Sequence, residues 1–443
     1  MPGNLSGRRR SAESHSGAPG KPGCRWFSRA AGWHDAQVTD SPELSVDQDA
    51  GPRAVRPGRR PVIAGLGLTE FGKVYGRSSE QFAAEAVRRA VADAGLTLAD
   101  VDGLLTSSGV TRGISLDLQR DLGLTDLRLL THMQAYGSTA GSMVQYASMA
   151  VQSGLASVVA CVFADSPLQP SRRSSAIYGT RHAGSGWWGL LGASGVVGAN
   201  PMYALAARRH MARYGTTSEQ LGHIAVAQRG WAGLNPAAQM RDPITLADHQ
   251  ASRWIVEPFH LLDCCLVSNG GIAVLVTTAE RAAQLAQPPV HVLGWAQSHP
   301  GHYLRRDPDF GLVSGAAQAG PAALAMAGLR VTDVDVVQLY DCYTFTVLLT
   351  LEDYGFCAKG EGGPFAASGV LGPGGKLPLN TGGGQLSGYY MWGMTPLSEA
   401  IIQARGQGGE RQAEARDIVL VSGNGGVLDH HATLVLGTPE AAR

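Results

Sequence analysis

One segment of this chain occurs twice, once in each half. Residues 94–105 read Ala-Gly-Leu-Thr-Leu-Ala-Asp-Val-Asp-Gly-Leu-Leu, and residues 327–338 match them without a gap at Ala, Gly, Leu and the Asp-Val-Asp triplet. Each copy closes a helix-like stretch, and an apolar strand precedes that stretch at residues 61–67 and 289–294. Self-similarity of this kind indicates that one supersecondary unit has been duplicated. The repeat therefore predicts the order strand, helix, strand in both halves.

The two halves also continue alike beyond the repeat. In each, a glycine-containing loop leads to a helix, expected at residues 142–154 and 395–405, and then to an apolar strand at residues 158–163 and 418–421. Continuous runs of Val, Ile and Leu are typical of buried parallel strands. We therefore expect an α/β protein that consists of two mixed βαβ halves with helices in layers.

Between the halves, residues 201–215 space their apolar side chains helically and stop at a glycine. Together with the stretch to about residue 260, this segment reads as an inserted cap. We predict an N-terminal half at residues 61–280, which includes the cap insertion at about 168–260, and a C-terminal half at residues 281–443.

Residues 1–60 differ from the rest of the chain in composition. They are rich in Arg, Ser and Gly and have no sustained apolar period, so we expect a disordered leader. A basic N-terminus could target a chain to an organelle, but the acidic residues between positions 35 and 49 argue against a transit signal. A start codon assigned too far upstream is equally consistent with this composition.

Composition excludes several classes of protein. With 443 residues, 44% of them hydrophobic, the chain can bury a large core, and its formal net charge of zero gives no electrostatic footprint for nucleic acid. No uninterrupted apolar run reaches the roughly 18 residues of a membrane span. Six cysteines without regular spacing, and no secretory hydrophobic region, favour a reduced cytoplasmic protein.

The segment at residues 377–394 is rich in glycine and contains Asn380, Gly383, Gly384 and Gly393. This spacing resembles the catalytic loop of thiolases, which reads Asn-x-x-Gly-Gly and closes with Gly-His-x-x-Gly. The count from the asparagine places Tyr390 where a thiolase carries its histidine. A register shifted by one would place Tyr389 there, but only the count that selects Tyr390 also aligns the last glycine.

Two further thiolase motifs have lost their thiols. Ser138-Thr-Ala-Gly141 resembles the thiolase Cys-Ala-Ser-Gly motif, with Ser138 at the position of the nucleophilic cysteine. The Cys-x-Gly-Gly-Gly loop of thiolases should fall within residues 421–427, which contain no cysteine. An alcohol without a paired base is a far weaker nucleophile than a thiolate. The chain therefore resembles a thiolase that no longer runs Claisen chemistry.

The resemblance covers about residues 61–443 and is most specific in two segments. Residues 261–276 are similar to the segment that closes the first half in the sterol-carrier-protein-x and lipid-transfer-protein group of thiolase-like proteins. Residues 340–357 occupy the place of that family's Asn-Glu-Ala-Phe or His-Asp-Cys-Phe motif. Tyrosine at both Tyr340 and Tyr390 is similar to the bacterial steroid side-chain-cleaving aldolases.

This resemblance implies a duplicated thiolase fold and a carbon–carbon lyase. The expected reaction is the retro-aldol cleavage of a β-hydroxyacyl-CoA, with a steroid C17 side chain as acyl group, to a ketone and a short acyl-CoA such as propionyl-CoA. Coenzyme A would enter as part of the substrate thioester, and no permanently bound cofactor is implied. The resemblance also implies a homodimer through an edge strand of the first half, which we assign to residues 158–163, and a companion protein with a zinc ribbon and an OB-fold in an α2β2 complex.

By the same resemblance, Tyr340 and Tyr390 are the catalytic residues, although Tyr340 could instead only pack at the end of its strand. Free phenols have a pKa near 10, so a base role needs help from a neighbour or from the substrate. Asp341 could order a tyrosine or a water, or it could cap the helix expected at residues 344–354. Cys342 reads as a small buried apolar group rather than a nucleophile.

Four further residues are candidates for supporting roles: Ser138, Gly425, Gly426 and His430. Glycines let backbone N–H groups approach a thioester oxygen, where they stabilise an enolate. The run Asp429-His-His431 cannot direct all three side chains at one metal ion, so we expect no metal there and leave one histidine to line the pocket. No segment identifies the coenzyme A site, because the family lacks a compact phosphate motif. The Arg pairs at 172–173 and 208–209 could meet the phosphates of coenzyme A, but we interpret both as solvated surface.

Two other functions are compatible with these motifs. Ser138 could accept the acyl group in a thiolase-like acyltransferase, but such an enzyme would lack a histidine at position 390. A non-catalytic scaffold that binds acyl-CoA or lipid is the second alternative. Two aligned ionisable side chains argue against a site that has decayed.

Overall fold

The computed structural model describes residues 59–172, 186–196, 198–301 and 308–442. The predicted leader at residues 1–60 therefore lies almost entirely outside the described residues, as does Arg173 of the first arginine pair. None of the helices in these ranges is long and apolar enough to cross a bilayer.

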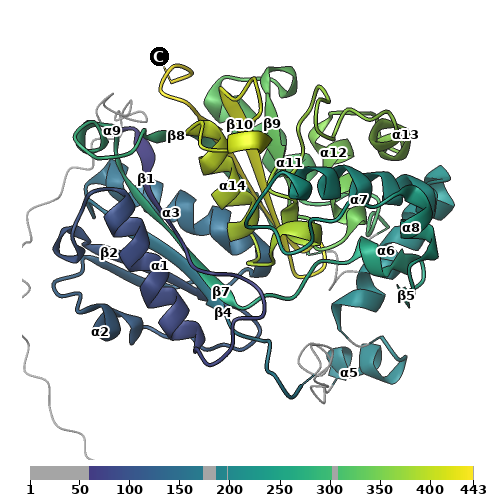
Figure 1. Ribbon diagram of the computed structural model, residues 1–443, viewed down its shortest axis with the longest axis horizontal. Helices are drawn as coiled ribbons and strands as arrows, with labels where there is room; N and C mark the ends of the chain where they lie inside the picture. Colours follow the sequence, from purple (N-terminus) through teal and green to yellow (C-terminus); the bar gives the residue numbers. More distant parts are fainter. Residues whose placement is uncertain (1–58, 173–185, 197, 302–307, 443) are drawn as a thin grey trace, which may run out of the picture. The chain divides into compact units, whose positions relative to one another are not determined.

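One mixed sheet of nine strands runs through both halves of the chain (Figure 1). Its order is β3-β2-β4-β7-β1-β8-β11-β10-β9. The strands are β1 Pro61–Leu68, β2 Gly103–Ser108, β3 Leu129–His132, β4 Val159–Asp165, β7 Gly270–Thr278, β8 Val290–Ser298, β9 Val336–Gln338, β10 Ile418–Gly425 and β11 His430–Gly437. The order is nearly symmetrical about the pairing of β1 with β8, which joins the two half-sheets at Val62↔His291 and Ile63↔Val290.

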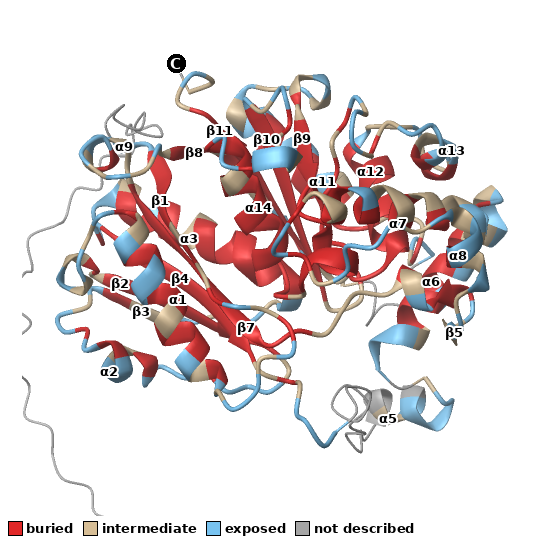
Figure 2. Ribbon diagram, in the orientation of Figure 1, coloured by how far each residue is buried: buried red, intermediate tan, exposed pale blue. Residues whose placement is uncertain are grey.

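Helices cover both faces of each half-sheet. Those outside the insertion are α1 Ser79–Asp93, α2 Leu118–Leu122, α3 Thr139–Ser153, α9 Ala279–Ala282, α11 Ala316–Ala327, α12 Thr344–Tyr354, α13 Gly362–Ala367 and α14 Met394–Ala404. The helices α3 and α14 pack against each other and against strands of both half-sheets, whereas α1 covers the outer face of β1, β4 and β7, and α11 that of β8 and β11. Figure 2 shows this central layer almost completely buried. The layers confirm the expected α/β fold.

The strand β4 shows why its sequence is continuously apolar. Val159, Cys161 and Phe163 belong to the hydrophobic cluster that includes α3, whereas Ala160 and Val162 belong to the cluster that includes α1. Successive side chains of a strand point to opposite faces, and both faces of this strand are covered. Burial on both faces therefore requires apolar residues at every position.

The same strand corrects one prediction. The edge strand of the first half was assigned to residues 158–163, but β4 pairs with β2 on one side and with β7 on the other. The edge of the first half-sheet is β3, a short strand that pairs only with β2 among the described residues. A run of apolar residues indicates burial of both faces but contains no information on which strand ends the sheet.

The repeated Asp-Val-Asp triplet has the same role in both halves. Each copy follows a helix, α1 or α11, and enters a strand, β2 or β9. The carboxylate of Asp102 accepts hydrogen bonds from the backbone N–H groups of Ser157 and Val158 at 2.8 Å, and that of Asp335 accepts one from Ile418 at 2.9 Å. These N–H groups lie where β4 and β10 begin. The second Asp of each copy thus satisfies backbone groups at the start of the neighbouring strand.

The insertion between β4 and β7 contains α5 Gly186–Ala193, α6 Ala199–Tyr214, α7 Ser218–Gly233, α8 Leu246–Ala251, β5 Trp254–Val256 and β6 Phe259–His260. A capping box of Thr217 and Gln220 starts α7, and Gly215 ends α6 with a positive φ of 78°. The helix α7 packs on α12, on α13 and on the glycine-rich loop. The insertion therefore covers the second half at the loop that bears Tyr390. The limit between the two halves, at residues 280 and 281, stays a prediction.

Candidate active site

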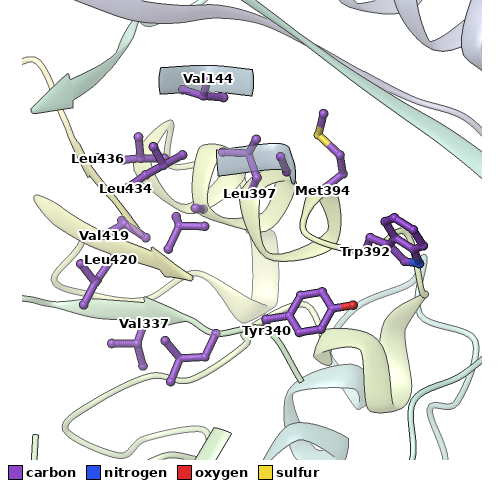
Figure 3. Packing of buried hydrophobic residues seen from close by; sticks show 14 of the residues in the cluster. Val144, Val337, Tyr340, Trp392, Met394, Leu397, Val419, Leu420, Leu434 and Leu436 are labelled. Atoms are coloured by element: carbon purple, nitrogen blue, oxygen red, sulfur yellow. The ribbon is translucent and has the colours of Figure 1, made fainter. Parts of the chain in front are cut away.

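Two tyrosine hydroxyls from separate motifs meet at the candidate site. Tyr340 follows β9, Tyr390 lies in the glycine-rich loop, and their hydroxyl oxygens are 3.3 Å apart. The backbone N–H of Tyr340 donates to Ser422 Oγ at 2.9 Å, and that of Tyr390 donates to Ser268 Oγ at 3.0 Å. Figure 3 shows the Tyr340 ring at the margin of the aliphatic cluster, with its hydroxyl directed away from Val337. These hydrogen bonds anchor the backbone of each tyrosine at the site.

The neighbouring Tyr389 points elsewhere. Its hydroxyl lies 3.0 Å from Ser398 Oγ, and its ring stacks on Phe71 with 4.0 Å between the ring centroids. The backbone of Tyr389 is extended, with φ −156° and ψ 159°, so successive side chains point to opposite sides. The structure therefore places Tyr390, and not Tyr389, beside Tyr340.

Asp341 forms hydrogen bonds with the backbone of the glycine-rich loop. Its Oδ2 atom accepts hydrogen bonds from the backbone N–H groups of Gln385 at 2.8 Å and Leu386 at 3.2 Å. Of the two roles considered for Asp341, that of helix cap is excluded, because α12 begins at Thr344 and its N-cap residue is Tyr343. Burial raises the pKa of Asp341 to about 7, although the two backbone hydrogen bonds oppose this rise. The carboxyl group therefore secures the loop that precedes Tyr390.

Asn380 makes a second connection between the loop and the Tyr340 segment. Its Oδ1 accepts from the backbone N–H of Leu339 at 2.7 Å, and its Nδ2 donates to the carbonyl oxygen of Leu339 at 2.9 Å. A cavity of about 10 Å³, near the smallest that can hold one water molecule, is lined by this asparagine and by Asp341. The two motifs that the sequence separates by some forty residues thus form one hydrogen-bonded unit.

Two glycines permit close approach at this site. Gly384 has a φ of 59°, and a Cβ atom there would lie 2.2 Å from Asp341 Oδ2. A Cβ atom on Gly137 would lie 2.2 Å from the Cζ atom of Tyr340 and equally close to the carbonyl oxygen of Asn424. Any larger residue would displace the loop or the phenol.

The other predicted residues lie around this centre with different partners. Ser138 is fully buried, and its hydroxyl donates to the carbonyl oxygen of Ala135 at 2.7 Å. Gly425 is the last residue of β10, and a Cβ atom on it would lie 2.4 Å from the carbonyl oxygen of Ala135. Gly426 has a positive φ of 60°. Gly425 therefore lies close to the segment that precedes α3, whereas a Cβ atom on Gly426 would lie 2.9 Å from the His430 ring.

The two histidines of β11 have separate environments. His430 Nδ1 lies 3.0 Å from His299 Nδ1, and the His430 ring stacks on Tyr136 with 6.1 Å between ring centroids. Burial, followed by the neighbouring His299, lowers the pKa of His430. His431 is buried, and its Nε2 atom lies 2.9 Å from the hydroxyl of Tyr354. Among the described residues no cluster of three potential metal ligands occurs.

Cysteine provides no activated nucleophile among the described residues. Burial raises the pKa of Cys342 to about 12 and that of Cys357 to about 12, and it also raises the pKa of Cys161. A catalytic thiol needs the opposite shift. The interpretation of Cys342 as a packing residue agrees with these environments.

The structure adds a residue that sequence reasoning missed. Tyr203 of α6 is buried, and its hydroxyl accepts a hydrogen bond from Asn424 Nδ2 at 3.3 Å. Burial, and then Cys342 and Tyr340, raise the pKa of Tyr203 well above its usual range. Helical spacing within residues 201–215 was visible in the sequence, but it does not indicate which face of the helix contacts the site.

Comparison with known proteins supports the same family in both halves of the chain. Residues 296–438 match the thiolase C-terminal domain-like family. The chain is 41% identical over 391 residues to the steroid side-chain-cleaving aldolase of Thermomonospora curvata, which covers 84% of this chain and 97% of that protein. It is 38% identical over 384 residues to the 17-hydroxy-3-oxo-4-pregnene-20-carboxyl-CoA lyase of Mycobacterium tuberculosis, which covers 82% of this chain and 96% of that protein.

A solved structure agrees with these relatives. The Ltp2-ChsH2(DUF35) aldolase matches with a TM-score of 0.78 and 40% identity, over 87% of this chain and 99% of that chain. The chain therefore belongs to the thiolase superfamily, in the sterol-carrier-protein-x and lipid-transfer-protein group that includes the steroid side-chain-cleaving aldolases.

Proposed function

We propose that this chain is a carbon–carbon lyase that cleaves a β-hydroxyacyl-CoA with a hydroxyl at steroid C17. The products are a 17-ketone and a short acyl-CoA such as propionyl-CoA. The observation that carries the proposal is the pair of hydroxyls of Tyr340 and Tyr390, 3.3 Å apart, in a thiolase fold without catalytic thiols. The names of the two similar relatives, an aldolase and a CoA lyase, support it.

The paired hydroxyls suit a proton relay. Burial, and then the Cys342 thiol, raise the pKa of Tyr340 well above its usual range, although the hydrogen bond with Tyr390 lowers it. A free phenolate is therefore unfavourable in this pocket. In the relay, the substrate hydroxyl gives its proton to Tyr390, Tyr390 passes its own to Tyr340, and Tyr340 protonates the α-carbon. Both phenols are neutral before and after the reaction, so neither has to titrate.

The electron pairs of the substrate move in the same step as these proton transfers. The O–H bonding pair becomes the π pair of the ketone, and the bond between C17 and the α-carbon breaks. Its pair forms the enolate of the acyl-CoA, which collapses to the thioester when its α-carbon takes the proton. Backbone N–H groups in the Gly425–Gly426 region support the charge on the enolate oxygen. Coenzyme A enters only as part of the substrate.

Incubation of the chain with the CoA ester of a 17-hydroxy steroid side chain tests the proposal. Stoichiometric release of 17-ketone and propionyl-CoA is expected. An acyl group on Ser138, detected by intact-protein mass spectrometry, would favour the acyltransferase alternative, and binding without turnover would favour the scaffold. The acyltransferase is disfavoured because the Ser138 hydroxyl donates to a backbone carbonyl, at 2.7 Å, rather than to a base.

The assembly that we propose is a cytoplasmic homodimer that binds a companion protein. The exposed edge of β3 gives each subunit unpaired backbone groups that a second copy can satisfy. The name of the solved relative, Ltp2-ChsH2(DUF35) aldolase, supports a companion protein. We propose that this companion contains a zinc ribbon and an OB-fold. Light scattering after size exclusion is expected to give a dimer alone and an α2β2 complex on co-expression. A fully active monomer would contradict both expectations.

A further inference from the structure

The insertion reaches the tyrosine pair through Tyr203. This residue and His210, seven positions further along α6, are both buried and lie on one face of the helix. His210 Nε2 lies 3.0 Å from Glu352 Oε2 of α12, and the ring of Tyr203 lies 4.8 Å from that of Tyr343. The helix α6 is thereby docked on the segment that follows Tyr340.

Tyr203 is bonded to a residue that touches Tyr340. Asn424 Nδ2 donates to the Tyr203 hydroxyl at 3.3 Å. Because the carbonyl oxygen of Asn424 and the Cζ atom of Tyr340 both lie 2.2 Å from the Cβ position of Gly137, they are direct neighbours. The backbone of Asn424, whose side chain bonds Tyr203, therefore lies beside the phenol ring of Tyr340.

Asn424 carries a polar atom that no described residue satisfies. The residue is 2% exposed, and its Oδ1 has no hydrogen-bond partner among the residues that the structure describes. A buried amide group without a hydrogen-bond partner is destabilising, and native structures keep few of them. A ligand group that pairs with this amide would remove that cost.

The amide can face a ligand in either orientation. A tyrosine hydroxyl both donates and accepts, and an amide side chain has nearly the same shape when it is turned over. Turned over, Asn424 accepts from the Tyr203 O–H through Oδ1 and directs its NH2 group to the position of the unsatisfied atom. Its contact with Tyr203 is kept, and a hydrogen-bond donor then takes the place of the unpaired acceptor.

We propose that Asn424 is a substrate-binding residue whose NH2 group donates to the thioester carbonyl oxygen, and that Tyr203 is the positioning residue that orients this amide. This inference rests on the proposed lyase function. It names the group that donates a hydrogen bond to the oxygen on which the enolate charge develops. During cleavage the carbonyl π pair moves to that oxygen, and it returns when the α-carbon is protonated. A donor that is already in place stabilises this charge.

The test compares two ligands that differ at the oxygen, propionyl-CoA and its thioether analogue S-propyl-CoA. Their dissociation constants are measured by calorimetry for the full chain and for Asn424→Ala. The unchanged chain is expected to bind the thioester about tenfold more tightly than the thioether, the effect of one hydrogen bond. Asn424→Ala is expected to bind both alike. A preference that is equal in the two proteins would overturn the proposal.

Three further variants keep the test decisive. Asn424→Asp has the same shape but replaces the donor by an acceptor, so it is expected to prefer the thioether even if the alanine variant does not fold. Tyr203→Phe is expected to reduce the preference. Tyr343→Phe is the matched control, since it removes another buried tyrosine hydroxyl, which donates to Asn200 instead. If both phenylalanine variants lost the preference equally, Tyr203 would have no specific positioning role.

The binding assay also separates this inference from the function on which it rests. Ketone release by the unchanged chain, with an unaltered ligand preference in Asn424→Ala, would keep the lyase function and reject the role of Asn424. If the unchanged chain released no ketone, but Asn424→Ala lost the preference for the thioester, the thioester site would be kept and the lyase function rejected.

Discussion

Tyr390→Phe is expected to lower turnover of the CoA ester by about 10² or more, the scale of one acid–base group, while the fold stays intact. Phenylalanine keeps the ring and removes only the hydroxyl that lies 3.3 Å from Tyr340. The measurement is the single-turnover rate of ketone release, together with the thermal unfolding midpoint.

Tyr389→Phe is the matched control for this variant. It removes a buried hydroxyl from the adjacent residue, where the partner is Ser398 rather than Tyr340. Its expected cost is about 1 kcal/mol of stability with turnover close to that of the unchanged chain. A large loss of turnover in Tyr389→Phe, with little in Tyr390→Phe, would move the catalytic role to Tyr389.

The proposed relay also predicts how the rates of single and double variants of the same pair compare. Because each phenol passes on the proton that it receives, loss of either hydroxyl breaks the whole path. Tyr340→Phe, Tyr390→Phe and the double variant are therefore expected to have similar rates, since residues that act as one unit are not additive. Rates that multiplied in the double variant would indicate two independent roles.

Asp341→Asn is expected to change how stability depends on pH. The pKa of Asp341 rises from 3.8 to about 7, mainly through burial. The folded state thus binds this proton more tightly than the unfolded state, so the contribution to stability is full below about pH 4 and is lost as pH rises through about 7. The shift corresponds to a loss of up to about 4 kcal/mol across this window.

Asparagine can keep the loop contacts without a titrating group. Its Oδ1 atom can accept from Gln385 and Leu386 as the carboxylate does, and it cannot ionise. Urea unfolding at intervals from pH 4 to pH 8 is expected to give similar stabilities at the acid end and a more stable variant at the alkaline end. Equal pH slopes for the two proteins would show that Asp341 does not titrate in this range.

Some contacts of the site could be anticipated from the chain, and others could not. The resemblance to the steroid side-chain-cleaving aldolases implied that Tyr340 and Tyr390 act together, and the structure places their hydroxyls 3.3 Å apart. Of the roles considered for Asp341, the helix cap is excluded, and its carboxylate instead bonds Gln385 and Leu386, more than forty residues away. Local patterns cannot distinguish a helix cap from such a distant contact, because aspartate suits both.

The duplicated architecture was readable from local sequence, whereas the neighbours of each element were not. The repeat and the apolar runs report which faces of helices and strands are buried, and these properties depend on residues a few positions apart. The edge position of β3, the internal position of β4 and the approach of Tyr203 to Asn424 depend on pairings between distant segments. Such pairings form only when the whole chain packs, so tertiary structure alone determines them.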